Sequence, residues 1–250
     1  MSTAPARIAM WSGPRTLSTA LMRSFASRAD TVVIDEPLYG FYLTQTGLDH
    51  PGRDEIIASM PCDWREVLDR LRAGALPAGR TICYAKHMTH HLLPEVDRAG
   101  LDGMRHAFLI RNPWRLLASY AKVRRHPTLA GLGLAQQVEI FRRFGGPVID
   151  SADLAARPRQ ALEALCAALG IGFDPAMLSW PPGPASFDGV WGRYWYDRVW
   201  ASTGFGDAGA GSREADGSSQ TGLPPELEQL AARCQPYYAE LAAHRLAVAG

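Results

Sequence analysis

Residues 7–25 read RIAMWSGPRTLSTALMRSF, and this stretch decides the fold. Residues 7–11 form a short apolar run that predicts a buried strand, and residues 16–29 carry the apolar stripe of a helix. The turn between them contains Gly13 and Arg15. A helix N-terminus offers unsatisfied N–H groups and a partial positive charge, so a basic turn at this point predicts a phosphate site. An ordinary capped helix would also use Gly, Pro, Ser and Thr here.

The pattern of short apolar runs alternating with helical stretches continues to about residue 170. Further strands are predicted at Thr31–Asp35 and at residues 81–85, 106–110 and 148–149, and helices at residues 63–73, 114–125 and 157–169. Strands that alternate with helices pair in parallel and carry helices on both faces of one sheet. The predicted fold class is therefore α/β, a three-layer sandwich with a mainly parallel central sheet.

The C-terminal third differs in composition. Residues 187–205 are dense in Trp, Tyr and Phe, whereas residues 204–224 are rich in Gly, Ser and Asp and predict a mobile loop. A C-terminal helix is predicted over residues 225–249. At 250 residues, the chain is expected to form one domain over residues 1–250 with this loop as an insertion.

Composition excludes several classes of protein. Hydrophobic residues make up 47% and charged residues 20%, which excludes a collagen, a coiled coil and a wholly disordered chain. No apolar run approaches the roughly 20 residues that cross a bilayer, so no membrane association is expected. The four cysteines show no paired spacing, which predicts a reduced, cytoplasmic protein with neither a disulfide framework nor a metal site.

The net charge of +1, from 26 basic and 25 acidic residues, gives no basic excess and argues against nucleic-acid binding. The charges are nevertheless segregated. Residues 1–28 and residues 105–125 contain several basic side chains and no acid. Two such segments can converge on one small anion, or can simply be solvated arginines.

The second basic segment contains Arg111, at the end of the predicted strand 106–110, and Ser119 on the helix that follows. Open α/β sheets bind ligands at the carboxyl ends of their strands, so Arg111 is placed to meet a ligand of the first loop. That loop is not an ATPase P-loop, because Gly13 has no second glycine after it and no lysine follows.

Together the two segments resemble the sulfotransferase family, whose sulfuryl donor is 3′-phosphoadenosine 5′-phosphosulfate. The family's first loop commonly reads Pro-Arg-Ser-Gly-Thr-Thr, which residues 14–19 match except for Leu17 at the glycine. Its 3′-phosphate signature, an Arg followed eight residues later by Ser, matches Arg111 and Ser119. Residues 148–170 resemble a third stretch, Glu-Asp-Leu … Pro … Leu-Gly. The closest likeness is to a bacterial subgroup sometimes named as branched-chain aminotransferase-like.

The resemblance implies a P-loop NTPase-like fold, a small-molecule acceptor with a hydroxyl or amine, and no metal. It does not indicate an oligomeric state. The residues that it implies for donor binding are Gly13, Pro14, Arg15, Thr16, Leu17, Ser18, Thr19, Arg111 and Ser119.

Sulfuryl transfer needs a base for the acceptor proton and cations for the developing charge. Glu36, after the strand Thr31–Asp35, resembles the base of carbohydrate-directed sulfotransferases. His87 is the rival, because Lys86-His87 resembles a Lys-x-His element of the family with one residue missing. Neighbours on a strand point to opposite faces, so we expect Lys86 to face the ligand and Glu36 to be the base. Arg15 is the other expected leaving-group cation.

Several residues keep two interpretations. The aromatic segment 191–200 either builds core or lines a pocket for an acceptor with an aromatic or apolar body. Arg193 and Arg198 are candidates for the 3′-phosphate. His90 and His91 are expected at a helix start or on the surface, with contact to the acceptor as the alternative for either. Two alternative functions stay open: a P-loop-type kinase or NTPase, because residues 32–36 resemble a magnesium-binding strand end, and a non-catalytic nucleotide-binding module.

Overall fold

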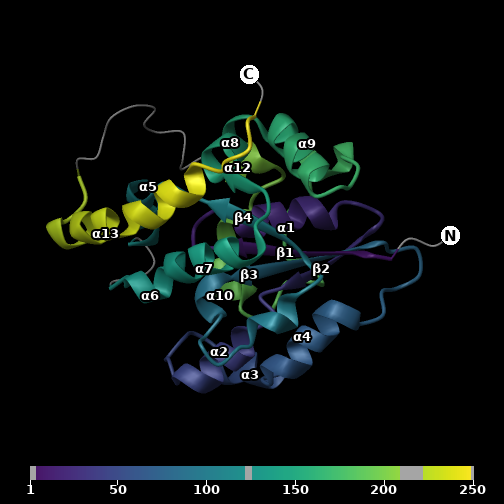
Figure 1. The fold of residues 1–250 in the computed structure, drawn as a ribbon, viewed down its shortest axis with the longest axis horizontal. Coiled ribbons are helices and arrows are strands. Elements are labelled where there is room, and N and C mark those ends of the chain that lie inside the picture. Colours follow the sequence, from purple (N-terminus) through teal and green to yellow (C-terminus); the bar gives the residue numbers. More distant parts are fainter. Residues whose placement is uncertain (1–3, 122–125, 209–221, 249–250) are drawn as a thin grey trace.

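A five-stranded parallel sheet forms the centre of the molecule. The computed structural model describes residues 4–121, 126–208 and 222–248. The strands are β1 (Ala6–Ser12), β2 (Thr31–Asp35), β3 (Ile82–Met88), β4 (Arg105–Ile110) and β5 (Val148–Asp150). They lie in the order β2-β3-β1-β4-β5, and each pair of neighbours is parallel. Helices lie above and below this sheet in Figure 1, which confirms the predicted three-layer α/β class.

Helices connect the strands and cover the sheet. In the first half of the chain they are α1 (Ser18–Ala26), α2 (Tyr39–Thr46), α3 (Arg53–Ser59), α4 (Trp64–Ala73), η1 (Thr89–His91), η2 (Arg98–Leu101) and α5 (Pro113–Tyr120). In the second half they are α6 (Leu129–Leu132), α7 (Leu134–Phe144), α8 (Ser151–Ala156), α9 (Pro158–Ala168), η3 (Pro175–Leu178), α10 (Gly192–Trp195), α11 (Asp197–Trp200), α12 (Phe205–Ala208) and α13 (Pro225–Ala242).

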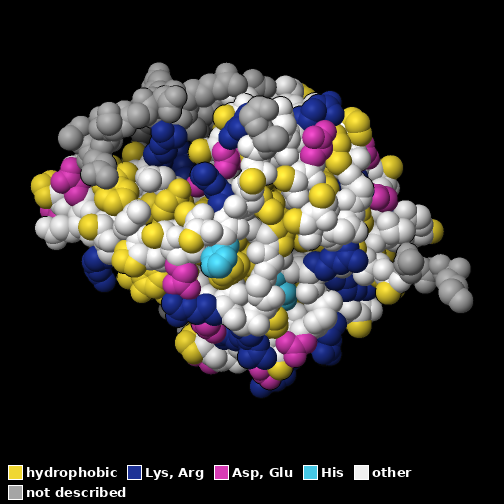
Figure 2. All heavy atoms as spheres, turned by 45° about the horizontal axis from the view of Figure 1, so that its top comes forward, with side chains coloured by type: hydrophobic (Ala, Val, Ile, Leu, Met, Phe, Trp, Pro, Cys, Tyr) yellow, Lys and Arg dark blue, Asp and Glu magenta, His cyan; other side chains and the backbone are white. Residues whose placement is uncertain are grey.

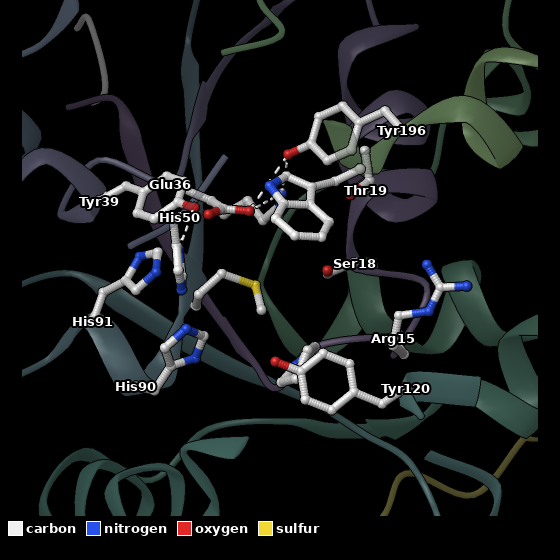
Figure 3. Close-up of a pocket in the computed structure, with 14 residues that line it drawn as sticks. Arg15, Ser18, Thr19, Glu36, Tyr39, His50, His90, His91, Tyr120 and Tyr196 are labelled. Carbon is white, nitrogen blue, oxygen red and sulfur yellow. Dashed lines mark hydrogen bonds and ion pairs between the residues drawn. The ribbon is translucent and has the colours of Figure 1, made fainter. Parts of the chain in front are cut away.

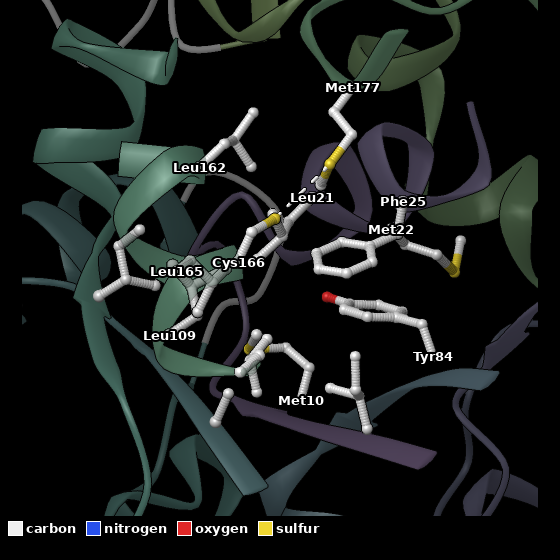
Figure 4. Close-up of a cluster of buried hydrophobic side chains, with 14 of the residues drawn as sticks. Met10, Leu21, Met22, Phe25, Tyr84, Leu109, Leu162, Leu165, Cys166 and Met177 are labelled. Carbon is white, nitrogen blue, oxygen red and sulfur yellow. Dashed lines mark hydrogen bonds between the residues drawn. The ribbon is translucent and has the colours of Figure 1, made fainter. Parts of the chain in front are cut away.

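Alternate strand residues build two hydrophobic cores, one on each face of the sheet. On the first face, Met10 and Tyr84 pack against α1 and α9. The ring of Phe25 from α1 stacks on Tyr84 with centroids 4.1 Å apart (Figure 4). On the second face, Trp11 and Ala85 pack against α4, α7 and α13. Because both faces are covered, the strands are apolar almost throughout, as the sequence pattern predicted.

Two element boundaries near the site differ from the sequence prediction. Strand β3 was expected to end at residue 85 and continues to Met88, because its parallel pairing with β1 runs on to the pair Ser12 and Met88. Lys86 therefore lies inside the strand. Helix α1 starts at Ser18 instead of residue 16, because Arg15 and Leu17 adopt left-handed backbone angles that no α-helix contains.

Three further predicted segments differ from the structure. The predicted mobile loop 204–224 begins with helix α12, whose Phe205 is buried in the first core; residues 209–221 lie outside the described residues. Helix α13 ends at Ala242, short of residue 249, because the chain turns back and the Leu246 amide donates a hydrogen bond to the Val148 carbonyl. Helix α5 ends at Tyr120, and residues 122–125 of the predicted helix 114–125 are not described.

The surface carries mixed charge. On the face drawn in Figure 2, Lys and Arg side chains lie interspersed with Asp and Glu among the described residues. A nucleic-acid-binding face instead shows a continuous basic stripe. This face agrees with the near-neutral composition of the chain.

Strand β1 has β3 on one side and β4 on the other, so the chain order reverses at the middle of the sheet. In open α/β sheets, ligands bind at the carboxyl ends of the strands beside such a reversal. The loop after β1 lies at this point, and the fold therefore places residues 13–19 where a ligand site is expected.

Candidate active site

A cavity of about 130 Å³ opens at the carboxyl ends of β1, β2 and β3. Figure 3 shows Arg15, Ser18 and Thr19 on one side of it, and Glu36, Tyr39 and three histidines on the other. The residues that line it are Pro14, Arg15, Ser18, Thr19, Glu36, Tyr39, His50, Lys86, Met88, His90, His91, Tyr120, Trp195 and Tyr196. The cavity therefore joins the predicted phosphate loop to the predicted base.

The first side of the cavity is the N-terminus of α1. No side chain caps this helix, and its first turn contains no acid. The hydroxyl of Thr16 is turned inward and donates to the Gly13 carbonyl at 2.8 Å, which closes the loop. Leu17 has a φ of 68°, which explains why the related loops carry glycine at this position. The free N–H groups and the helix dipole favour an anion here.

Arginines from both acid-free segments meet beside this helix end. Arg15 donates through Nε to Ser119 Oγ at 3.1 Å, and Arg111 donates to the carbonyl of Arg15. Burial, with Arg15, Arg115 and Arg198 nearby, lowers the pKa of Arg111 to about 10. Burial and then Arg198 also lower the pKa of Arg15. Positive charge is thus concentrated at one place, as the segregation of charge predicted, and an anion would relieve the repulsion.

The two arginines of the aromatic segment are placed differently. Arg193 pairs with Glu55 on the surface and does not line the cavity. Arg198 is close enough to perturb the pKa of both Arg15 and Arg111. Of the two candidates, the structure brings Arg198 to the arginine cluster.

Lys86 lies at the centre of a buried network on the other side of the cavity. Its Nζ donates to Asp35 Oδ1 at 2.7 Å, to Glu36 Oε1 at 2.8 Å and to Tyr196 Oη at 2.6 Å. These three bonds use every N–H of the ammonium. Burial opposes its charge, but Asp35 and then Glu36 outweigh burial and raise the pKa of Lys86. The lysine is therefore held as a cation between two carboxylates.

Glu36 is aimed at the cavity by an unusual backbone. Its φ of 41° lies in the left-handed region, which costs a glutamate of order 1 kcal/mol or more and is typical of functional sites. Lys86 holds Oε1, and Oε2 accepts no hydrogen bond from the described residues. Burial, with a further contribution from Asp35, raises the pKa of Glu36 against the opposing effect of Lys86. A carboxylate with one open oxygen and a raised pKa is suited to accept a proton.

His87 lies on the opposite face of β3, away from the cavity. Its ring stacks on Trp11 with centroids 4.2 Å apart, inside the second core. Burial, with His106 nearby, lowers its pKa to about 3. The expectation that Lys86 faces the ligand agrees with this alternation, whereas the second-choice base does not reach the cavity, because consecutive strand residues point to opposite faces.

The histidines of η1 lie in a short 3₁₀-helix, as the helix-start interpretation expected. His90 and His91 are buried and line the cavity; they are not surface residues. The ring of His91 stacks between Tyr39 and Tyr42, with centroids 4.6 Å from each. Burial, reinforced by His90 and His50, holds the pKa of His91 well below its usual value, so this ring is neutral.

The aromatic segment supplies both core and pocket. Trp191 is buried against Tyr39, whereas Trp195 and Tyr196 line the cavity. Sequence reasoning named this segment but gave Tyr196 no role. It also missed His50, whose Nδ1 lies 2.8 Å from Tyr39 Oη. Neither residue belongs to a motif, so no sequence signal pointed to them individually.

Three further observations concern the cysteines, membrane-spanning helices and metal ligands. All four cysteines are unpaired. Within the described ranges, no helix is long and apolar enough to span a membrane. Over the same ranges, no three His, Cys, Asp or Glu side chains are arranged to hold a metal ion.

Comparison with known proteins identifies the family. Residues 6–223 match the family model described as Sulfotransferase domain. "Branched-chain-amino-acid aminotransferase-like protein 1" of Arabidopsis thaliana is 41% identical over 206 residues, which are 80% of this chain and 37% of that protein. "Branched-chain-amino-acid aminotransferase-like protein 2" of the same organism is 39% identical over 78% of this chain and 35% of its own length. The chain thus spans just over a third of the length of these curated relatives.

Solved structures agree in fold. A sulfotransferase from Alicyclobacillus acidocaldarius matches with a TM-score of 0.57 at 17% identity, over 97% of both chains. The sulfotransferase domain of the curacin biosynthetic pathway matches with a TM-score of 0.54 at 16% identity, over 94% of this chain and 99% of that one. At these identities the likeness shows a shared fold.

Proposed function

Because the chain belongs to the sulfotransferase domain family, we propose that it transfers a sulfuryl group from 3′-phosphoadenosine 5′-phosphosulfate to a hydroxyl or amine of a small molecule. One observation carries this proposal. An uncapped, arginine-rich helix N-terminus and an open carboxylate oxygen on Glu36 line the same small cavity. A phosphate site and a base that share one cavity can bring donor and acceptor together.

The residues present fit a donor with two phosphate groups. The N–H groups of the loop 13–19, together with Arg15, Ser18 and Thr19, would hold the 5′-phosphosulfate. Arg111, Ser119 and Arg198 would hold the 3′-phosphate, since the repulsion within the cluster falls when a dianion binds. When bound, the donor supplies an electrophilic sulfur and a bisphosphate leaving group.

The chain's own contribution to the transfer is proton removal and charge stabilisation. Glu36 Oε2 would take the proton of the acceptor hydroxyl as the oxygen of that hydroxyl bonds to sulfur and the bisphosphate leaves. Arg15 would stabilise the negative charge that develops on the leaving phosphate. Lys86 would act through Glu36, because its ammonium already gives all three N–H groups to the buried network.

The acceptor side of the cavity favours a flat or apolar group. Tyr39, Tyr120 and Trp195 provide aromatic walls, and the volume of about 130 Å³ is similar to that of an engineered cavity of 150 Å³ that binds benzene. We therefore propose an acceptor whose reacting end is no larger than about one ring.

The two alternative functions have weaker support. A kinase or NTPase would use Asp35 and Glu36 for magnesium, but the Lys86 ammonium already lies between these carboxylates and would repel a second cation. A purely nucleotide-binding module is favoured if both candidate bases, Glu36 and His87, lie far from the anion site. Glu36 and Arg15 line one cavity, so that condition is not met.

Nucleotide binding tests the proposal before an acceptor is known. In buffer without magnesium, 3′-phosphoadenosine 5′-phosphate should raise the melting temperature far more than AMP or ATP at equal concentration. Titration calorimetry then gives the ratio of the dissociation constants. A protein that binds all three equally, or binds ATP only with magnesium, would contradict the proposed donor. Screening acceptors with the full donor would follow.

A further inference from the structure

The buried network around Lys86 contains two residues that neither the family resemblance nor the proposed steps use, Asp35 and Tyr196. Tyr196 Oη accepts from Lys86 Nζ and, at 3.1 Å, from Trp191 Nε1. With both lone pairs engaged, its proton is left for Asp35 Oδ2, 2.8 Å away. Asp35 Oδ2 also accepts from the Gly189 amide at 3.2 Å. The hydrogen-bonding capacity of the tyrosine is therefore filled.

The same bonds fix Glu36. Its backbone N–H donates to the Lys86 carbonyl at 2.9 Å, and its Oε1 accepts from Lys86 Nζ. Tyr196 Oη lies 3.4 Å from Oε1 as well. Lys86 is 1% exposed and Tyr196 4%, so water does not compete for these bonds. Because Lys86 Nζ occupies Oε1, Oε2 is the oxygen left for the cavity.

We propose that Asp35 and Tyr196 are positioning residues for the base: they hold Lys86 Nζ against Glu36 Oε1 and so leave Oε2 open to the acceptor. This inference rests on the proposed function, because it assigns them their role through Glu36. Neither residue is proposed to touch substrate. Tyr196 comes from the aromatic segment and lies 160 residues from Glu36 in sequence, so the segment both covers the cavity and completes the base.

The two residues act on Glu36 in opposite directions. The negative charge of Asp35 raises the pKa of Glu36, whereas the Tyr196 hydroxyl, 3.4 Å from Oε1, lowers it. Removing each in turn should therefore move the titration of Glu36 in opposite directions, which a loss of structure alone would not do. The other titratable groups that line the cavity are Arg15, Tyr39, Lys86, His50, His90, His91 and Tyr120. Tyr84, on β3, also faces Asp35.

The test follows the side-chain carboxyl of Glu36 by NMR in protein labelled with ¹³C at the glutamate carboxyl carbon, so no acceptor is needed. Glu36→Gln assigns the signal. Saturating 3′-phosphoadenosine 5′-phosphate is present throughout. We expect the midpoint of the Glu36 titration to rise in Tyr196→Phe and to fall in Asp35→Asn, each relative to the wild-type protein. The acidic limb of kcat/KM should move the same way once an acceptor is identified.

Matched controls come from the same segment. Tyr194→Phe removes a half-exposed hydroxyl that contacts Arg193, and Asp197→Asn neutralises an exposed carboxylate. Both should leave the Glu36 titration unchanged. If Asp35→Asn does not fold, Tyr196→Phe alone decides the question, because it removes one hydroxyl and leaves the ring in place.

The outcomes separate the two proposals. An unchanged Glu36 titration in Tyr196→Phe, in protein that still binds 3′-phosphoadenosine 5′-phosphate, would overturn the positioning role and leave the proposed function standing. Shifts of the same sign in both variants would also overturn it. Failure of the wild-type protein to bind this nucleotide would instead refute the proposed donor, whatever the titration shows.

Discussion

Replacing Arg111 with alanine tests the assignment of the two ends of the donor. The guanidinium lies among Arg15, Arg115 and Arg198 and donates to the Arg15 carbonyl. The substitution therefore removes two things: a proposed contact to the 3′-phosphate and a bond that fixes the loop backbone. The first matters only to a nucleotide with a 3′-phosphate, whereas the second matters to any nucleotide in the loop.

The two losses differ in size. A hydrogen bond between an arginine and a phosphate contributes about 1.5–3 kcal/mol, so the loss of this contact alone should weaken the binding of 3′-phosphoadenosine 5′-phosphate roughly 10- to 150-fold. Loosening the Arg15 backbone should cost both nucleotides about 0.5–1.5 kcal/mol, which is roughly a 2- to 12-fold loss. The ratio of the two dissociation constants, which measures the preference for the 3′-phosphate, should therefore fall roughly 10- to 150-fold, whereas AMP binding should weaken only roughly 2- to 12-fold.

Titration calorimetry at fixed salt without magnesium measures both dissociation constants. Arg143→Ala is the matched control, because this half-exposed arginine pairs with Asp102 at 3.8 Å and lies over the Phe144 ring, and its loss changes the net charge equally. It should leave both constants within about twofold. Equal losses for the two nucleotides in Arg111→Ala would show that Arg111 does not recognise the 3′-phosphate.

Four further outcomes are expected. Glu36→Gln should lower kcat, measured by steady-state kinetics, by about 10²- to 10⁴-fold. Nucleotide binding, measured by calorimetry, should stay unchanged. An unchanged kcat would exclude Glu36 as the base. Arg23→Ala should lower the free energy of unfolding by about 3–5 kcal/mol, because it leaves Asp188 buried without its ion pair; both side chains are 4% exposed. The melting temperature should therefore fall by roughly 6–20 °C. A fall of less than about 2 °C would contradict this expectation. The free energy of unfolding should fall as pH drops from about 6.5 toward about 3, by up to about 1.4 kcal/mol per pH unit from His87. The reason is that the lowered native pKa of His87 lets only the unfolded state gain the proton in this range. Denaturant titrations of His87→Phe should show a shallower pH slope, and an equal slope would refute the assignment. Chelator should leave sulfuryl transfer unchanged, and loss of activity that magnesium restores would favour the kinase alternative.

Local sequence was enough to predict the part of the fold that carries the proposed phosphate site. Thr31–Asp35 is a strand with the predicted bounds, and the strand–turn–helix unit at residues 7–25 is present with a shorter helix. Parallel pairing followed from the alternation of strands and helices. Because parallel strands end at one edge of the sheet, Arg15 and Arg111 were expected to meet, and they do.

The boundaries that the sequence misplaced depend on partners. Strand β3 continues through Lys86 because β1 pairs with it to the end, and helix α13 stops early because Leu246 bonds to Val148. Helical periodicity and strand alternation describe a segment alone. They contain no information on which neighbouring strand supplies the next hydrogen bond.

By itself, the sequence determined the α/β class and the strand–turn–helix unit of the proposed anion site, since both follow from near-neighbour patterns and strand polarity. It left open whether the two basic segments converge or are solvated. It also limited the choice between Lys86 and His87 to one residue per face, because strand residues alternate. Only the tertiary structure decided that Lys86 faces the cavity and that Tyr196 and Asp35 hold it there. Those contacts join segments 110 and 51 residues apart, and packing of the whole chain sets their distance.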